Sequence, residues 1–323
     1  MRSRSKVVCF VVLVVAMLLT AAPSASAWNS HGACTAIIIE DQRWLDSYRT
    51  VSVTEWTYAD VDTEATGPNF TLRYLEGGPG TVTSATAILA NYADEPDWYM
   101  DTDLSLSAFQ ALTGGSQGWR HCYAGLGWLR FGTGPARAQY FYDLAVTAKD
   151  KGDLYWTFRY LARSMHYVQD LTQQYHGVPA PIGIILKNIG SFGTLVEMCA
   201  NHHYNMEEYQ GLMVARRSPA YMRTLRDGKP FEATKGITAA WLGRRGTWLG
   251  RPEVRQLWPL ENTFFGEKVN SGEAWTFDKT TALRTAKPGT PQADYDTLVL
   301  TSLERMSGYT RTLLQIAREG LSL

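Results

Sequence analysis

The segment MHYVQDLTQQYH, residues 165–176, places two histidines and an aspartate within eleven positions of a chain that holds only six histidines. His166 and Asp170 are four residues apart, so on a helix their side chains lie on one face, one turn apart. An imidazole nitrogen and a carboxylate oxygen held in this way suit a zinc ion. His176 follows six residues later and could bind a second cation. The pattern H-x-x-x-D alone also occurs as an ordinary surface pair, so it needs support from the rest of the chain.

A second histidine–carboxylate pair lies in the segment NHHYNME, residues 201–207. His203 and Glu207 are again one helical turn apart. His202 competes with His203, but only His203 has a carboxylate four residues on, and Glu208 is the weaker alternative acid. The ordinary interpretation is a buried, hydrogen-bonded histidine beside a surface acid. Two helices that each offer such a pair instead predict the floor of a site for more than one zinc ion.

The first 27 residues read as a secretory signal peptide. Arg2, Arg4 and Lys6 form a basic start, the apolar run that follows is too short to span a bilayer, and residues 25–27 read Ala-Ser-Ala. We therefore expect a mature chain, residues 28–323, that is secreted, extracellular and soluble, and begins at Trp28.

The charge of the mature chain argues against one class of partner. Removing three basic residues from the 31 in the full sequence leaves 28 against 31 acidic residues, a formal charge near −3. Tight binding to duplex DNA usually requires a basic face, so we expect none. The mature chain keeps Cys34, Cys122 and Cys199, of which one pair could be oxidised outside the cell; the pairing stays open.

The coarse pattern predicts a mostly α-helical, single-domain bundle. Helical spacing of apolar residues appears in 31–48, 106–112, 135–149, 196–213 and 294–318. Asp153 is a suitable N-cap for a long helix that we expect to run to about Gln174. Residues 178–183 read as a loop, and β-branched and aromatic residues in 50–74 predict a short hairpin. The region 216–293 gives no clear pattern.

The order of these residues resembles the bacterial zinc-dependent phospholipase C family, whose fold the fungal single-strand-specific nucleases share. The matching order is a tryptophan at the cleavage point, an early histidine, Asp94 in Tyr-Ala-Asp, a mid-chain histidine, H-x-x-x-D-x-x-x-x-x-H and finally H-x-x-x-E. The segment YLARSMHYVQD, residues 160–170, is very similar to the family's central helix. The resemblance covers roughly residues 28–208.

This resemblance implies three zinc ions. Trp28 would bind one ion through its free α-amino nitrogen and carbonyl oxygen, with His31 beside it. Asp170 would bridge that ion to a second one. The third ion would be bound by three ligands, His176, His203 and Glu207.

The second ion would be completed by His121, His166 and Asp94. The gap from Asp94 to His121 is longer than is usual in the family, so Asp97 or Asp101 are alternatives, with Asp94 preferred. Asp94 is also the expected general base.

The implied activity is hydrolysis of a phosphodiester by attack of a zinc-bridging hydroxide on phosphorus, without a serine or cysteine nucleophile. Glu207, in place of aspartate, favours a phospholipase C acting on a phospholipid headgroup. A lip at residues 182–186, Ile-Gly-Ile-Ile-Leu, would permit transient contact with a membrane surface. The alternatives are a single-strand nuclease on the same fold and a secreted zinc-binding protein without activity. We expect a monomer.

Overall fold

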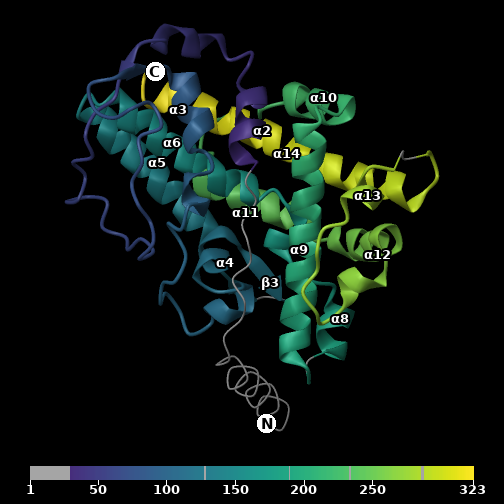
Figure 1. Cartoon of the computed structure of the whole chain (residues 1–323). Helices are drawn as coiled ribbons and strands as arrows, with labels where there is room; N and C mark the ends of the chain where they lie inside the picture. The colour runs from purple at the N-terminus through teal and green to yellow at the C-terminus, as the bar shows by residue number, and fades with distance from the viewer. Residues whose placement is uncertain (1–29, 127–128, 189, 233, 285–286) are drawn as a thin grey trace.

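A computed structural model describes residues 30–126, 129–188, 190–232, 234–284 and 287–323, and these are mostly helical (Figure 1). The α-helices are α2 (His31–Ile38), α3 (Ala85–Tyr92), α4 (Ser116–His121), α5 (Gly134–Asp150), α6 (Leu154–Asp170), α7 (Gln174–Gly177), α8 (Ile182–Lys187), α9 (Phe192–Ala215), α10 (Pro219–Asp227), α11 (Ala239–Gly250), α12 (Val254–Phe265), α13 (Lys279–Ala282) and α14 (Pro291–Gly320). Four 3-10 turns complete the helical elements: η1 (Arg43–Tyr48), η2 (Glu95–Asp97), η3 (Gln110–Thr113) and η4 (Glu267–Asn270). The predicted mostly helical fold is confirmed.

Helix α6 lies at the centre of the molecule. The Asp153 side chain caps its first turn by accepting a hydrogen bond from the Trp156 amide at 3.2 Å. Every residue from Tyr155 to Asp170 is buried, as expected of a helix enclosed by others rather than one that faces solvent. Helices α3, α5, α11 and α14 all pack against it. The helix that carries His166 and Asp170 is therefore enclosed on all sides by other parts of the fold.

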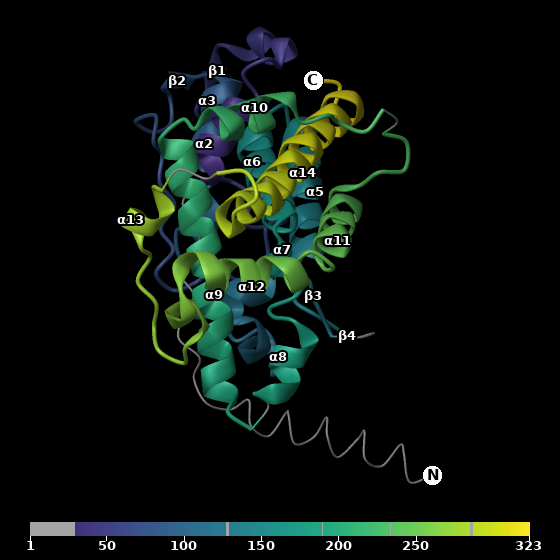
Figure 2. The ribbon, with the colours of Figure 1, turned by 90° about the vertical axis from the view of Figure 1, so that its right-hand side faces the viewer.

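Two apolar cores lie on either side of the region where α6 ends. One core joins α3, α5, α6 and the C-terminal part of α14, and includes Trp156, Phe158 and Leu313. The other joins α9, α10, α12 and the N-terminal part of α14, and includes Met206 and Trp258. In Figures 1 and 2 the yellow helix α14 runs diagonally past both groups of helices. The side chains proposed as ligands come from elements of both groups.

Some local predictions were wrong. Helix α6 ends at Asp170 rather than near Gln174, because the chain turns there: the Thr172 hydroxyl donates to the Gln169 carbonyl at 2.6 Å and the Gln173 amide to the Asp170 carbonyl at 2.9 Å. His176 consequently lies on the separate helix α7.

The other differences concern the periphery. Ile182 and Gly183, the last two residues of the predicted loop, instead begin helix α8, and only a 3-10 turn forms near residues 106–112. The predicted hairpin within 50–74 is wrong: β1 (Val51–Ser52) pairs antiparallel with β2 (Val82–Thr83), beyond that segment. A second short hairpin joins β3 (Ala124–Leu126) to β4 (Leu129–Phe131). Among the described residues, no helix has the length and apolarity needed to cross a bilayer.

Candidate metal centre

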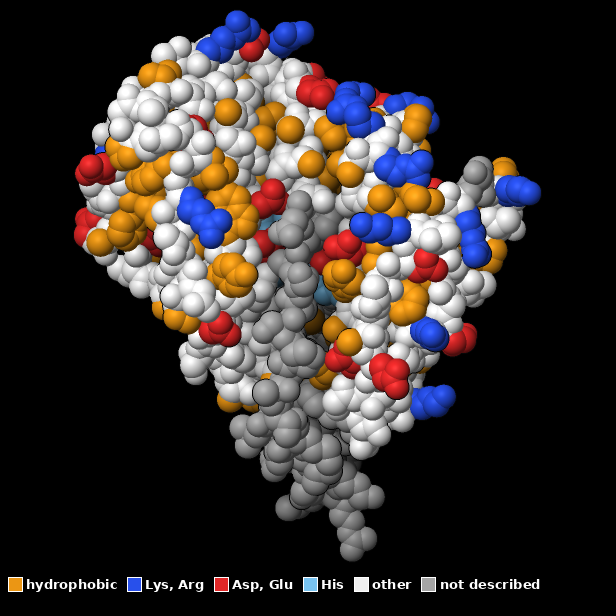
Figure 3. Space-filling view, viewed as in Figure 1, with side chains coloured by type: hydrophobic (Ala, Val, Ile, Leu, Met, Phe, Trp, Pro, Cys, Tyr) orange, Lys and Arg blue, Asp and Glu red, His pale blue; other side chains and the backbone are white. Residues whose placement is uncertain are grey.

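Histidine and acidic side chains from six separate elements converge where the two cores meet. Three groups of donors have ligand atoms within 4.8 Å of one another: His31/Asp97/His166, His121/His166/Asp170 and His176/His203/Glu207. They come from α2, η2, α4, α6, α7 and α9. Figure 3 shows histidine and acidic side chains close together near the middle of this face.

Asp170 connects two of these groups through its two carboxylate oxygens. Its Oδ2 lies 2.8 Å from Nδ1 of His121 and 3.2 Å from Nε2 of His166. Its Oδ1 instead faces Nε2 of His31 at 3.1 Å and Nε2 of His176 at 3.9 Å. A carboxylate with one oxygen toward each set of imidazoles is suited to bridging two cations.

The third group is compact and lies closer to the surface. Nε2 of His203 lies 2.9 Å from Oε1 of Glu207 and 2.8 Å from Nε2 of His176. Nε2 of His176 is 3.4 Å from the same Glu207 oxygen. His203 retains 22% side-chain exposure, whereas His176 and Glu207 are buried. Three protein donors with an open side are the pattern of a site that leaves room for water or substrate.

The second ring nitrogens of four histidines are held by hydrogen bonds that fix the rings. Nδ1 of His166 lies 2.7 Å from the Ala93 carbonyl, and Nδ1 of His176 lies 3.1 Å from the carbonyl of His121. A carbonyl oxygen only accepts, so these Nδ1 atoms donate, and in the neutral ring Nε2 is left as a bare ligand atom. In the same way, Nδ1 of His31 bonds to Gln169 Oε1 at 2.9 Å.

His121 has the opposite orientation. Its Nε2 lies 3.0 Å from Oδ2 of Asp101, which leaves Nδ1 to face Asp170. The Asp101 carboxylate is itself held by Arg120, Arg137 and Tyr167. A carboxylate behind a ligating histidine is a common arrangement at zinc sites, because it fixes the tautomer and the ring orientation.

The donor set fits zinc. Two pairs of imidazole nitrogens face each other, His176/His203 at 2.8 Å and His121/His166 at 3.1 Å. Two lone pairs at this distance repel unless a proton or a cation lies with them. Among the described atoms, Oδ2 of Asp97 is buried and has no hydrogen-bond partner. Nitrogen and carboxylate donors in this mixture are the ligands that zinc prefers in proteins.

The ionisation of the cluster reflects burial opposed by close charges. Burial raises the pKa of Glu207, but His203 and His176 outweigh it and hold that pKa at about 2. Burial likewise opposes the charged form of Asp170, yet His166 and His176 keep its pKa well below the usual value.

The pKa values of His121 and Asp97 are raised. Burial lowers the pKa of His121, but its hydrogen bonds to Asp101 and Asp170 raise it to about 10. For Asp97 burial dominates over the nearby histidines and raises its pKa well above the usual value. Asp170 and Glu207 therefore favour the ionised form and stabilise positive charge in the cluster, whereas burial favours the neutral form of Asp97.

Of the nine ligands predicted from the sequence, the structure brings seven together: His31, His121, His166, Asp170, His176, His203 and Glu207. Trp28 and the predicted signal peptide lie outside the described residues. His202 points away from this cluster and pairs with Glu261 at 2.8 Å.

The preference for Asp94 over Asp97 needs correction, because the structure places Asp97 among the histidines. Oδ1 of Asp97 lies 3.6 Å from both His121 Nδ1 and His166 Nε2. Asp94 precedes the 3-10 turn η2, and its Oδ1 accepts a hydrogen bond from the Gly32 amide at 3.1 Å. The turn directs the two carboxylates to different neighbours. Asp101, the other alternative, lies behind His121 rather than among the ligands.

A buried ion-pair network that the sequence analysis missed holds η2 in place. Glu95 has no exposed side chain and binds Arg159 and, at 2.8 Å, Arg163 of α6. Burial raises the pKa of Glu95, but the two arginines outweigh it and lower that pKa to about 2. No spacing rule pairs residue 95 with residues 159 and 163, so only the three-dimensional fold identifies the contact.

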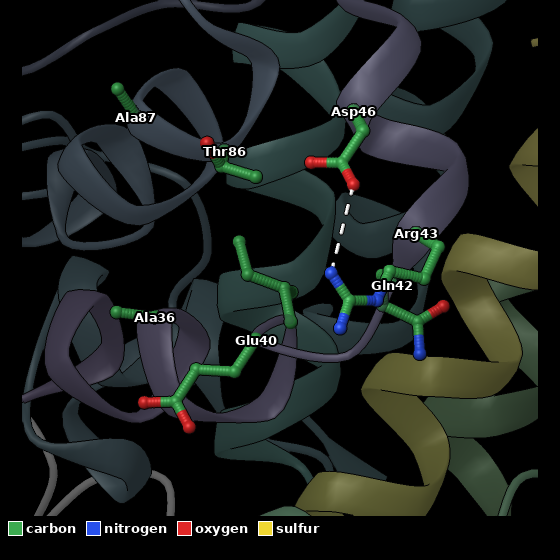
Figure 4. Close-up of a pocket in the computed structure, with 8 residues that line it drawn as sticks. Ala36, Glu40, Gln42, Arg43, Asp46, Thr86 and Ala87 are labelled. Atoms are coloured by element: carbon green, nitrogen blue, oxygen red, sulfur yellow. Dashed lines mark ion pairs between the residues drawn. The ribbon is translucent and has the colours of Figure 1, made fainter. Parts of the chain in front are cut away.

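The cysteines and the surface pocket contribute no donor to the cluster. Cys34, Cys122 and Cys199 are unpaired in the structure, and Sγ of Cys122 lies 3.8 Å from Nδ1 of His176, the ring nitrogen on the side away from Glu207. Figure 4 shows a pocket between the C-terminal end of α2, η1 and the start of α3, with the Arg43–Asp46 ion pair at its edge. None of the residues that line it belongs to the histidine cluster.

Comparison with models of known families finds no match to this chain, and neither does comparison with curated protein sequences. Among solved structures, alpha-toxin of Clostridium perfringens from an avian strain is similar, with 11% sequence identity and a TM-score of 0.36. That match covers 93% of this chain and 66% of the toxin chain, so this chain spans just under two thirds of the length of the protein it matches. The functional assignment therefore depends on the geometry of the cluster.

Proposed function

We propose that the protein is a secreted, zinc-dependent phosphodiester hydrolase of the phospholipase C type. The observation that carries this proposal is Asp170, whose two oxygens face different imidazole sets within a cluster of three donor groups. A cluster that only stabilised the fold would be expected to close each site with four protein ligands. The group around His203 has three, and it is partly exposed.

The proposed ligands are His31, Asp97, His121, His166 and Asp170 for two ions, with the third ion on the group around His203. Trp28, with its free amino group, completes the first site in the proposal. When bound, paired zinc ions supply Lewis acidity toward phosphoryl oxygens and lower the pKa of a bound water.

The residues of the chain prepare the site for this chemistry. Asp101, Gln169 and two backbone carbonyls hold the imidazoles in the tautomers that expose their ligand nitrogens. Asp97 brings a buried carboxylate oxygen without a hydrogen-bond partner among the described atoms, and we assign it the acid–base role that the sequence suggested for Asp94. The cluster is rich in donors that bind cations. It therefore suits an anionic phosphodiester only when metal ions are bound.

A phospholipid is the substrate that the surface favours. Helix α8 follows the ligand His176 closely and exposes Ile182 by 44% and Leu186 by 56%. The net negative charge of the mature chain disfavours a long polyanion such as nucleic acid.

The test uses purified mature protein. We expect two to three zinc ions per chain and release of phosphocholine from phosphatidylcholine vesicles, abolished by a strong chelator and restored by zinc. Nucleotide release from single-stranded DNA without lipid hydrolysis would instead identify a nuclease. Fewer than two zinc ions per chain, or hydrolysis that survives the chelator, would contradict the proposed function.

A further inference from the structure

A second buried polar cluster lies behind the third group of donors and is centred on Glu261 of α12. The Glu261 side chain has no exposed surface, and His202 is the one basic partner it has among the described residues. Its carboxylate is satisfied mainly by neutral donors. Oε2 accepts from the hydroxyl of Tyr175 at 2.7 Å and faces Nδ1 of His202 at 2.8 Å, while Oε1 accepts from the amide of Asn205 at 2.7 Å.

Three of the four partners are close chain neighbours of a proposed ligand; the fourth, the hydroxyl of Tyr295 on α14, donates to Oε1 over 3.5 Å. Tyr175 immediately precedes His176 on α7, and His202 immediately precedes His203 on α9. Asn205 is two residues before Glu207 on the same helix. One carboxylate therefore joins the short helix α7 to the long helix α9 at positions one or two residues from the three ligands.

The partners are themselves fixed, which makes the junction rigid. The His202 ring stacks on Trp258 with centroids 3.5 Å apart and an interplanar angle of 19°. The Asn205 carbonyl oxygen accepts from the Trp275 indole at 2.9 Å, so its amide nitrogen must face Glu261. These contacts restrict the arrangement of the surrounding helices, although Nε2 of His202 is buried and has no hydrogen-bond partner among the described atoms.

The position of helix α7 depends on such contacts with its surroundings. It has only four residues, and a helix this short is not stable by itself. The distance of 2.8 Å between Nε2 of His176 and Nε2 of His203 depends on how α7 sits against α9. A small shift of α7 would separate the two nitrogens that must point to one ion.

We infer that Glu261 is a positioning residue that sets the zinc affinity of the His176/His203/Glu207 group by clamping α7 to α9. The inference rests on the proposed function for the presence of zinc, and it assigns to Glu261 no contact with metal or substrate. Residues that orient metal ligands from behind typically account for roughly 10–100-fold in metal affinity.

The decisive variant is Glu261→Gln, which keeps the shape but turns one acceptor into a donor facing other donors. We expect the zinc ion of the His176/His203/Glu207 group to lose about 10–100-fold in affinity, with the other two ions unchanged, measured by competition with a chromogenic chelator. Loading with Co²⁺ should show the loss of one metal's visible absorption, a signal that reduced stability alone does not produce.

Asp296→Asn is the matched control. Asp296 accepts hydrogen bonds from the hydroxyls of Tyr209 and Tyr221, at 2.9 and 2.6 Å, and so ties α9 to α10 and α14 without touching α7. It should lower the melting temperature while leaving all three zinc affinities unchanged. If Glu261→Gln does not fold, Tyr175→Phe removes a single hydroxyl and should weaken the same ion to a smaller degree.

The outcomes separate this inference from the proposed function. Wild-type zinc affinity in folded Glu261→Gln, or in folded Tyr175→Phe should the first variant not fold, overturns the role of Glu261, as does an equal loss in Asp296→Asn. A wild-type protein that binds three zinc ions but hydrolyses no phosphodiester contradicts the proposed function and leaves the role of Glu261 standing. A wild-type protein without zinc overturns both.

Discussion

Oδ2 of Asp170 lies 2.8 Å from Nδ1 of His121, although the two residues are 49 positions apart in the chain. The other carboxylate oxygen of Asp170 faces His31. One side chain thus touches both imidazole sets of the cluster, and its removal should affect two metal ions together.

Asp170→Asn is therefore expected to reduce the zinc content by two ions per chain and to abolish hydrolysis. Each affected affinity should fall by more than about 100-fold, since even residues behind a ligand typically contribute 10–100-fold. Elemental analysis after dialysis against a weak chelator measures the loss. Asp143→Asn, an exposed aspartate that bonds only to Gln139 among the described contacts, is the control and should keep full zinc content. Loss of a single ion in the Asp170 variant would rule out the bridging role.

The assignment of Asp97 over Asp94 gives a second test. Asp97→Asn should weaken zinc binding and reduce the rate by more than about tenfold, because it removes a buried oxygen without a partner. Asp94→Asn keeps an oxygen that can accept from the Gly32 amide and should retain most of the activity. Rates on a soluble phosphodiester measured at saturating zinc decide between them. The reverse order of effects would restore Asp94 as the ligand.

These two aspartates show how far sequence analysis could reach. The pairs His166/Asp170 and His203/Glu207 were predictable because each lies within one helix, where spacing alone fixes a shared face. The choice between Asp94 and Asp97 depends on the orientation of the 3-10 turn η2, which is set by contacts with residues that are distant in the sequence.

Glu95 and Glu261 show what the sequence analysis could not predict. Each is a buried carboxylate whose partners come from distant segments, Arg159 and Arg163 for one and Tyr175 and His202 for the other. No sequence pattern distinguishes either of them from a surface acid, because a charged residue is rarely buried without a partner that only the fold supplies.

The Glu95 network should contribute strongly to stability. Glu95→Gln leaves two buried arginines without their carboxylate and should lower the free energy of unfolding by about 3–5 kcal/mol. Urea denaturation monitored by circular dichroism measures the change. Asp46→Asn removes an exposed pair with Arg49 at 3.0 Å and should cost less than about 1 kcal/mol. Similar losses in the two variants would show that the buried network contributes no more to the free energy of unfolding than an exposed ion pair does.

The close packing of α2 on α3 gives a further prediction. A Cβ atom at Gly32 would lie 2.5 Å from the Ala90 carbonyl oxygen, so Gly32→Ala must push α2, which carries His31, away from α3. We expect a loss of roughly 1–3 kcal/mol in stability together with weaker binding of one zinc ion. Gly183→Ala is the matched control in α8, where a Cβ would meet no atom within 4 Å. That variant should be neutral or slightly stabilising, and a harmless Gly32→Ala would show that α2 can move without effect.

The exposed apolar side chains of α8 distinguish a lipid substrate from other phosphodiesters. Replacing Ile182 and Leu186 together by aspartate should lower hydrolysis of phosphatidylcholine vesicles by at least about tenfold, because burying one such side chain contributes roughly 1.5–3 kcal/mol. Hydrolysis of a short-chain, monomeric phosphatidylcholine should not change, since it needs no surface contact. Leu283→Asp, on a side chain with 44% exposure after α13, is the control and should leave both rates unaltered. An equal loss on vesicles and monomers would mean that α8 supports the fold of the site rather than contact with a lipid surface.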